Sequence, residues 1–338
     1  MLADLEGAGR RAVGAPVEPF PSTQPPPTTA LDGPHPLRRS RTMLRFRVPA
    51  STTNLGHGFD CLGIALDLAN TISVEPGGDV VTAPGAADPG LVTMAARVRD
   101  ACAAAWRVAL PGFAVRITGD VPIARGLGSS STILLGVAAA CQRLAGRPFA
   151  RAELIPICAE LEGHPDNVTA ACLGGFTVVG AAPEGLRFAR FAVPAHLVAV
   201  IAIPPFEVKT SEARRILPQQ LSRGEAILGL QRTALITAAL AAGETGALRG
   251  LFDDAWHEGH RSALNPGLIE ARTAARDAGA IGTILSGSGS TVLSFVERDQ
   301  ASAVAGAVHA AYATAGVKVA MRVMDFDVMG LTACDPST

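Results

Sequence analysis

A short stretch rich in glycine and serine, RGLGSSST at residues 125–132, carries residue types that bind phosphate. Gly126 and Gly128 have no Cβ, so the backbone can approach an anion closely. The lysine of the common phosphate loop GxxxxGK[ST] is absent. Backbone N–H groups at the start of a helix can bind an anion without it. Two interpretations stay open: an anion-binding loop, or a tight strand-to-helix turn whose serines cap the helix.

Three other polar, glycine-containing stretches interrupt apolar segments of the chain. They are VPASTTNLGHGFDCLGIAL (48–66), EGHPDNVTAACLGGF (162–176) and LSGSGST (285–291). Such stretches are hard to explain as independent turns, because turns need few residues of this kind. We therefore expect them to contribute to one site together with the loop at 125–132.

The elements that must position these loops follow from hydrophobic periodicity. Alternating patterns predict strands at 44–51, 64–77, 112–122, 174–181, 197–205 and 318–328, and two more on either side of the glycine turn within 280–296. Helical patterns are predicted at 91–108, 130–144, 151–163, 209–217, 225–250, 268–280 and 299–316. Strands and helices mix without strict alternation, which predicts an α+β fold.

The composition of the chain limits its class. Of 338 residues, 29 are Lys or Arg and 30 are Asp or Glu, so the near-neutral charge gives no support for a nucleic-acid or membrane-surface partner. Six cysteines form no CxxC pair and suit a reducing compartment. Without an apolar leader or spanning run, we expect a cytoplasmic protein. Residues 1–42 are rich in proline and predicted to be disordered; a targeting peptide, or a true start at Met43, are the alternatives.

The motifs resemble those of a known family. PIARGLGSSST (122–132) resembles the GHMP kinase phosphate-loop signature P-x-x-x-G-L-G-S-S-[AS], and ASTTNLGHGFDCLGIAL with EGHPDNV is similar to the homoserine kinase branch. The resemblance covers residues 43 to 330. It implies a two-domain α+β fold, with an N-terminal domain like the second domain of ribosomal protein S5 and a ferredoxin-like C-terminal domain. We expect these domains at 43–195 and 196–332, with the nucleotide between them.

The resemblance also implies an activity. Members of this branch transfer the γ-phosphoryl group of ATP, with Mg²⁺, to the hydroxyl of L-homoserine, which gives O-phospho-L-homoserine for threonine biosynthesis. A homodimer is expected from the family. Two alternatives stay open: another small-molecule kinase of the family, acting on mevalonate or a sugar, and a non-catalytic ligand-binding regulator with the same fold.

Nucleotide and metal roles carry over from the family motif. The ATP phosphates are assigned to the matching loop residues, which are Pro122, Ile123, Ala124, Arg125, Gly126, Leu127, Gly128, Ser129, Ser130, Ser131 and Thr132. The resemblance implies that Ser130 binds Mg²⁺ together with a glutamate from the end of the next helix. Glu160 matches best, and Glu162 is the alternative. Gly90 stands where many members carry an asparagine near the adenine.

Substrate roles are implied in the same way. Asn54 and Asp60 match the substrate loop, with Asp60 facing the ammonium group. Arg214 and Arg261 match two arginines that bind the carboxylate, a role that suits their planar, bidentate donors. The remaining matches are His164, Asp166 and Asn167 near the reacting hydroxyl, Thr210 near the phosphoryl group, and Gly287 in the loop that closes the site.

The chemistry implied by the resemblance lacks a dedicated base. In related kinases such as mevalonate kinase, an aspartate near the reacting hydroxyl is a proposed base, and Asn167 stands at that position here. An amide accepts no proton at neutral pH, so Asn167, Thr210 and Arg214 are expected to act by positioning and charge. His257 and His260 could be a metal pair, but without an HExxH pattern a solvated or capping role is expected.

Overall fold

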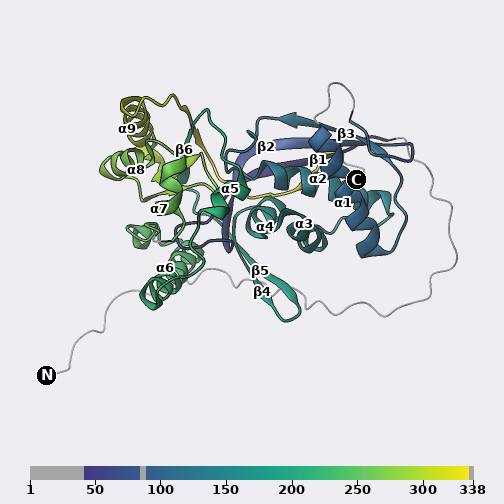
Figure 1. Ribbon diagram of the computed structural model, residues 1–338, viewed down its shortest axis with the longest axis horizontal. Coiled ribbons are helices and arrows are strands. Elements are labelled where there is room, and N and C mark those ends of the chain that lie inside the picture. Colours follow the sequence, from purple (N-terminus) through teal and green to yellow (C-terminus); the bar gives the residue numbers. More distant parts are fainter. Residues whose placement is uncertain (1–41, 84–88, 255, 335–338) are drawn as a thin grey trace. The chain divides into compact units, whose positions relative to one another are not determined.

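Two antiparallel sheets organise the chain, and a layer of helices packs on each (Figure 1). The structure is a computed structural model and describes residues 42–83, 89–254 and 256–334. The predicted disordered segment 1–42 lies outside these residues, except for Thr42. The mixture of antiparallel sheets and helices confirms the predicted α+β class.

The first sheet has the strand order β10-β1-β2-β4-β5, and β3 also pairs with β2. Its strands are β1 (Leu44–Thr53), β2 (Leu62–Pro76), β3 (Phe113–Gly119), β4 (Phe176–Ala182), β5 (Gly185–Phe191) and β10 (Thr332–Ala333). Four helices contact this sheet or one another: α1 (Pro89–Trp106), α2 (Ser129–Leu144), α3 (Leu154–Glu162) and α4 (Asp166–Leu173). An apolar core fills the space between them, with Phe46, Ile72 and Leu135 fully buried.

The second sheet has the strand order β7-β8-β6-β9. Its strands are β6 (Leu197–Ile203), β7 (Gly282–Leu285), β8 (Val292–Glu297) and β9 (Ala320–Met324). Helices α8 (Leu268–Asp277) and α9 (Ala301–Thr314) pack against it and bury a core that contains Val200 and Tyr312. Three more helices belong to this half of the chain: α5 (Thr210–Arg215), α6 (Arg223–Ala242) and α7 (Glu258–Arg261).

A third apolar core joins the two sheets. It contains Ile64 and Phe176 from the first sheet, Ile201 and Phe295 from the second, and Leu240 from α6. Loops that leave the facing ends of the sheets are therefore held against a rigid, close-packed interior. Side chains from distant parts of the sequence can keep fixed distances there.

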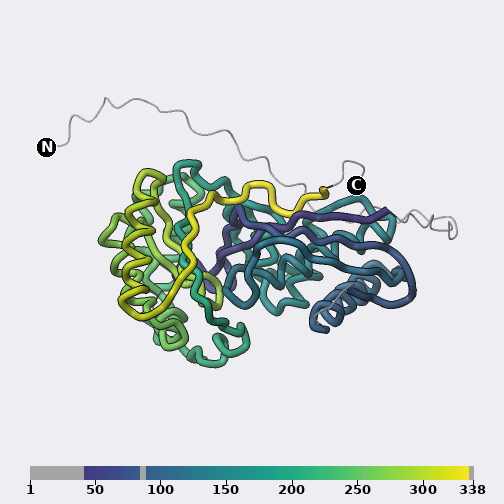
Figure 2. The backbone as a smooth tube through the Cα atoms, turned by 90° about the horizontal axis from the view of Figure 1, so that it is seen from above, coloured from purple at the N-terminus to yellow at the C-terminus, as the bar shows by residue number. Residues whose placement is uncertain are grey.

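The end of the described chain returns to the first sheet. Strand β10 pairs with β1 through Phe46 and Arg47, and Asp327 forms an ion pair with Arg47. Figure 2 shows this yellow segment beside the purple N-terminal strand. The predicted division into 43–195 and 196–332 stays a prediction, but β10 belongs structurally to the sheet of the first of these ranges.

Helix α6 ends earlier than its periodicity predicts. Ser222 and Glu225 form a reciprocal capping box at its start, and Gly243 in the left-handed conformation (φ 74°) ends it, whereas the sequence pattern predicted helix to residue 250. A 3₁₀ turn, Thr245–Leu248, follows. Glycine adopts positive φ without steric cost, so the stop at Gly243 is local.

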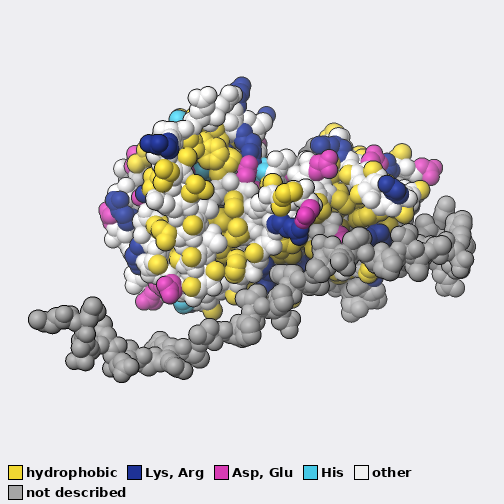
Figure 3. All heavy atoms as spheres, turned by 90° about the horizontal axis from the view of Figure 1, so that it is seen from below, with side chains coloured by type: hydrophobic (Ala, Val, Ile, Leu, Met, Phe, Trp, Pro, Cys, Tyr) yellow, Lys and Arg dark blue, Asp and Glu magenta, His cyan; other side chains and the backbone are white. Residues whose placement is uncertain are grey.

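Helix α6 also exposes much of its apolar surface. Ile227, Leu230 and Leu235 are exposed, and Figure 3 looks onto the side of the molecule where α6 lies, with hydrophobic side chains spread across it. Within the described residues, α6 is the one helix that is long and apolar enough to cross a membrane. Length and composition alone are weak support for a membrane span, because core helices of soluble proteins and signal sequences meet the same criteria.

Candidate active site

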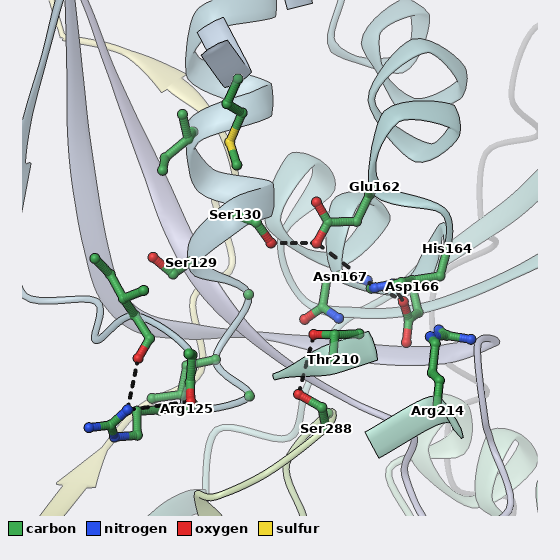
Figure 4. Close-up of a pocket in the computed structure, with 18 of the residues that line it drawn as sticks. Arg125, Ser129, Ser130, Glu162, His164, Asp166, Asn167, Thr210, Arg214 and Ser288 are labelled. Carbon is green, nitrogen blue, oxygen red and sulfur yellow. Dashed lines mark hydrogen bonds and ion pairs between the residues drawn. The ribbon is translucent and has the colours of Figure 1, made fainter. Parts of the chain in front are cut away.

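A cavity of about 440 Å³ lies where the glycine-rich stretches of the chain meet (Figure 4). Of the residues predicted to form the site, most line this cavity: Asn54, Ile123, Ala124, Arg125, Gly126, Leu127, Gly128, Ser129, Ser130, Glu162, His164, Asp166, Asn167, Thr210, Arg214, Arg261 and Gly287. The other predicted residues do not line it: Asp60, Pro122, Ser131, Thr132 and Glu160. The folded chain thus collects residues from position 54 to position 287 around one space.

The start of α2 faces the cavity without a capping side chain. Gly128 is the N-cap residue, in the left-handed conformation (φ 67°), and it makes no side-chain capping bond. A Cβ at this position would lie 2.4 Å from Ser51 Oγ, so only glycine fits. The neighbouring hydroxyls are used elsewhere, since Ser130 Oγ donates to Glu162 and Thr132 Oγ1 to the Ser129 carbonyl. Of the two interpretations of this loop, an anion-binding helix start therefore fits the geometry better than serine capping.

Ser130 and Glu162 place two oxygen ligands side by side. The Ser130 hydroxyl donates to Glu162 Oε1 at 2.5 Å, and both residues line the cavity next to the glycine loop (Figure 4). A carboxylate and a hydroxyl are hard oxygen donors, the kind that Mg²⁺ takes together with phosphate oxygens. Glu160, on the same helix, is exposed and lies outside the cavity. The residues present therefore fit a Mg²⁺ ion through Ser130 and Glu162.

A buried hydrogen-bond network fixes the middle of the site. Asp166 Oδ1 lies 2.7 Å from His164 Nδ1 and accepts from the Asn167 backbone N–H. Burial alone would lower the pKa of His164, but the hydrogen bond and charge of Asp166 raise it. Burial likewise favours a neutral Asp166, yet the His164 contact and the Asn167 N–H lower the pKa of this carboxyl. The two side chains thus hold each other in their charged forms.

The side-chain amide of Asn167 is held from two sides. Its Nδ2 donates to Thr53 Oγ1 at 3.1 Å, and its Oδ1 accepts from Ser51 Oγ at 2.9 Å. Both hydroxyls belong to β1, so the strand sets the orientation of the amide. Thr210 Oγ1 lies 3.5 Å from Ser288 Oγ, at the limit for a hydrogen bond, across the same cavity.

The loop between β1 and β2 adopts a strained backbone at two predicted residues. Asn54 and Asp60 both have positive φ, 63° and 54°. Such conformations cost free energy for residues other than glycine and cluster at functional sites. Asn54 Oδ1 accepts from the Asp60 N–H, and its Nδ2 donates to the Gly287 carbonyl at 3.1 Å. Asn54 therefore fixes the conformation of this loop and connects it to the glycine-rich loop at 285–291.

Asp60 and Arg214 form a bidentate ion pair. The two guanidinium nitrogens of Arg214 lie 2.9 and 2.6 Å from the two carboxylate oxygens of Asp60. Burial would lower the pKa of Arg214, but the Asp60 contact raises it. In the described part of the chain, ligand atoms of Asp60, His164 and Asp166 also come within 4.8 Å of one another. Arg214 offsets part of the acidic charge of this group, and the raised pKa of His164 favours its cationic form.

Arg261 is a buried cation without an acidic partner. Its side chain is among the largest that are fully buried, and the residue is 1% exposed. Nε donates to the Ala213 carbonyl, and one terminal nitrogen donates to the Gly287 carbonyl at 2.9 Å. Burial, and then the charge of Arg214, lower the pKa of Arg261 to about 10. No carboxylate among residues 42–83, 89–254 and 256–334 pairs with Arg261, although it lines the cavity.

His257 supports Arg261 in a neutral form. Its Nε2 donates to the Gly56 carbonyl at 2.9 Å, and its Nδ1 lies 3.4 Å from a terminal nitrogen of Arg261, which acts as the donor. Burial lowers the pKa of His257 from 6.5 to about 4. The predicted solvated role is therefore wrong for His257, because this side chain is fully buried. The residue occupies the N-cap position of α7, but its side chain makes no capping hydrogen bond.

The low pKa of His257 predicts a loss of stability in mild acid. His257 takes up a proton near pH 6.5 in the unfolded chain but only near pH 4 in the folded protein. The contribution of neutral His257 to the free energy of unfolding is therefore complete above pH 6.5 and is lost as the pH falls to about 4. The full difference corresponds to at most about 3 kcal/mol. We expect His257→Gln to flatten this part of the free energy of unfolding, measured by urea denaturation between pH 4 and 8. His309→Gln, at an exposed site on α9, is the control; equal curves for all three proteins would contradict the assignment.

The glycine-rich loops at 125–132 and 285–291 contact one another. Ser286 Oγ donates to the Gly126 carbonyl at 2.7 Å, and the Thr291 N–H donates to the Arg125 carbonyl. A Cβ on Gly126 would lie 2.0 Å from the Ser286 carbonyl oxygen. The Arg125 guanidinium bonds to the carbonyls of Pro204 and Pro205. The loop at 125–132 is thus held by backbone contacts to the second half of the chain.

One end of the cavity is apolar and was largely missed by the sequence analysis. Gly90, Leu91, Met94, Ile117 and Ile133 also line the cavity, and four of these five residues have apolar side chains. Leu91 and Met94 are three residues apart near the start of α1, so they share one face of that helix. This spacing is a signal that the sequence offered. An apolar slot beside an anion-binding loop suits a nucleotide base.

Comparisons with known proteins agree with this site. Residues 91–175 match the GHMP kinases N terminal domain, and residues 236–314 match GHMP kinases C terminal. A homoserine kinase of Nostoc sp. is 37% identical over 293 residues, which cover 85% of this chain and 97% of the relative. A homoserine kinase of Deinococcus radiodurans is 38% identical over 288 residues, with 83% and 93% covered. The chain therefore belongs to the GHMP kinase family.

Its place within that family follows from the same relatives. The crystal structure of a homoserine kinase from Cytophaga hutchinsonii superimposes with a TM-score of 0.78 at 26% identity, covering 86% of this chain and 97% of that one. Within the GHMP kinases, this chain groups with the homoserine kinases. The resemblance that the motifs suggested is thereby confirmed for the family and the fold.

Proposed function

We propose that this protein transfers the γ-phosphoryl group of ATP to the side-chain hydroxyl of L-homoserine and releases O-phospho-L-homoserine, an intermediate of threonine biosynthesis. The family and its homoserine kinase relatives support a kinase that uses ATP. The apolar slot beside Leu91 and the uncapped start of α2 suit the base and the phosphates of the nucleotide.

The observation that carries the substrate assignment is the charge arrangement at the other end of the cavity. An amino acid brings an ammonium and a carboxylate group. In the part of the chain that the structure describes, Arg261 is a buried cation that forms no ion pair, whereas Arg214 is paired with Asp60. A zwitterion can replace this internal pair, because its ammonium suits Asp60 and its carboxylate suits the two arginines. Mevalonate and sugars lack the ammonium, so Asp60 would gain no partner from them.

We propose that Ser130 and Glu162 hold Mg²⁺, with Glu162 rather than Glu160 as the acidic ligand. When bound, the ion neutralises phosphate charge that develops during transfer. Their contact at 2.5 Å and their place in the cavity support this choice. The first glycine loop and the N–H groups of α2 would then orient the phosphates.

The reaction is proposed to proceed without a protein base. Asn167 cannot take a proton, and Asp166 has a lowered pKa and is engaged by His164. A carboxylate with a low pKa is a poor proton acceptor at neutral pH. The transition state of phosphoryl transfer is loose, so fixed positions and charges can supply most of the acceleration. Asn167, held by Ser51 and Thr53, would orient the hydroxyl.

Three further expectations stay proposals. They are a cytoplasmic location, a homodimer, and the absence of nucleic-acid or membrane partners. The balanced charge of the chain supports the last of these.

ADP release with a panel of hydroxyl compounds tests the function. We expect turnover with L-homoserine and little with mevalonate, galactose or L-threonine, because only homoserine combines a primary hydroxyl with both charged groups. The product is verified by ³¹P NMR. Turnover with mevalonate or galactose would favour another kinase of the family. If the protein binds ATP but forms no ADP with any of these compounds, the result would favour a non-catalytic regulator.

A further inference from the structure

Phe59 lies against both arginines of the substrate end. The guanidinium carbon of Arg214 is 5.2 Å from the centre of the Phe59 ring, and that of Arg261 is 5.3 Å from it. Guanidinium groups at this distance from an aromatic centroid are attracted by the negative face of the ring. Phe59 does not itself line the cavity, whereas both arginines do. Its contacts with the site therefore pass through the two cations.

The Phe59 ring is itself held from the other direction. Its centroid is 4.4 Å from that of Trp256 in an edge-to-face arrangement, and 5.3 Å from the ring of His257. Edge-to-face pairs of this kind fix the ring orientation. His257 in turn accepts from Arg261 and is anchored to the Gly56 carbonyl. Phe59 is thus one layer of a packed aromatic cluster.

The electrostatic need for such a ring is greatest at Arg261. Within the described residues, Arg261 forms no ion pair: its hydrogen bonds go to the carbonyls of Ala213 and Gly287 and to the neutral His257, and the charges of Asp60, Asp254 and Glu258 act on it only from a distance. It also feels the charge of Arg214. A buried cation is costly unless something offsets its lost hydration. The ring face offers partial compensation while leaving donor groups free for an incoming anion.

We infer that Phe59 is a positioning residue that holds Arg214 and Arg261 for the α-carboxylate of the substrate and so makes the enzyme discriminate in favour of amino acids. This inference rests on the proposed function. An aliphatic residue of similar size would fill the space but would attract neither cation. A tyrosine would keep the aromatic face.

The test compares two substrates that differ only in the carboxylate. L-Homoserine and 3-aminopropan-1-ol share the hydroxyl and the amine, but the second lacks the carboxylate. For Phe59→Leu we expect kcat/KM with L-homoserine to fall about tenfold, mainly through KM, because two cation–π contacts are lost, one to the buried Arg261 and one to the half-buried Arg214. The values for 3-aminopropan-1-ol and the KM for ATP should change by less than about twofold. Phe59→Tyr should restore the wild-type preference.

Controls separate this role from packing. Phe149→Leu removes a half-buried ring outside the cavity, where Phe149 packs against Phe46, and should leave the preference unchanged. If Phe59→Leu does not fold, Phe59→Met gives the same comparison. Equal losses for both substrates, or an unchanged ratio of their kcat/KM values, would overturn the inference while the proposed function stands. Wild-type protein that phosphorylates neither compound would overturn the proposed function, and the inference with it.

Discussion

Replacing Glu162 with glutamine is expected to lower kcat about 10²–10³-fold, the range seen when one preorganised charge-stabilising group is removed. Glutamine keeps the length of the side chain and can still accept the Ser130 hydroxyl. It loses the negative charge that makes a hard cation ligand. The measurement is kcat as a function of Mg²⁺ concentration, and part of the loss should be recovered at high Mg²⁺.

Glu160→Gln is the matched control, because it makes the same change two residues earlier on α3. Its side chain is exposed and lies outside the cavity, so we expect activity within about twofold of the wild-type protein. A larger loss from Glu160→Gln than from Glu162→Gln would reverse the assignment of the metal ligand. Equal small losses would remove the acidic ligand from this helix altogether.

The choice between these two glutamates depends on which face of α3 each of them occupies. A family motif compared residue by residue favoured Glu160. Helical periodicity points the other way: Ile155 and Cys158 are buried, and Glu162 lies seven and four residues after them, on the same face. Glu160 lies on the opposite, exposed face. The apolar positions of α3 thus favour Glu162 as the glutamate that faces the cavity.

The loop at 125–132 could be predicted because its properties are local. Glycine at 126 and 128, the serines and the following apolar helix all lie within one short segment. Helix α4 as a whole was not predicted, in contrast, because the polar residues of HPDN at 164–167 resemble a loop, whereas Asp166 begins a helix in which every residue is buried. Strand β10 has only two residues, too few for any alternating pattern.

Other features of the site could not be predicted from any local pattern. Among the described residues Arg261 forms no ion pair, and its carbonyl partner Gly287 is 26 residues away. The family motif predicted that Asp60 faces the ammonium group of the substrate. It did not predict that Asp60 forms an ion pair with Arg214 in the free protein. Long-range contacts of this kind decide charge balance, and periodicity carries no information about them.

Replacing Arg261 with methionine is expected to lower kcat/KM for L-homoserine about 10²-fold or more, while the KM for ATP stays nearly unchanged. The cost of truncating one member of a buried charge pair reaches this range. Among the described residues no carboxylate forms an ion pair with Arg261, so its guanidinium can pair with a carboxylate brought by the ligand. Arg261→Lys keeps the charge but loses the fork and the Nε bond to Ala213, so an intermediate loss is expected.

Arg215→Met is the matched control for this arginine. Arg215 follows Arg214 on α5 but is exposed, so its removal should leave both KM values close to wild type. Calorimetric titration measures the affinities for L-homoserine and for ATP without turnover. Arg261→Met should bind the amino acid more weakly than the wild-type protein does and bind ATP with nearly unchanged affinity. Should Arg261→Met instead weaken ATP and leave L-homoserine unaffected, the cation belongs to the nucleotide end of the cavity. The carboxylate would then need Arg214 alone, which has to leave Asp60 to bind it.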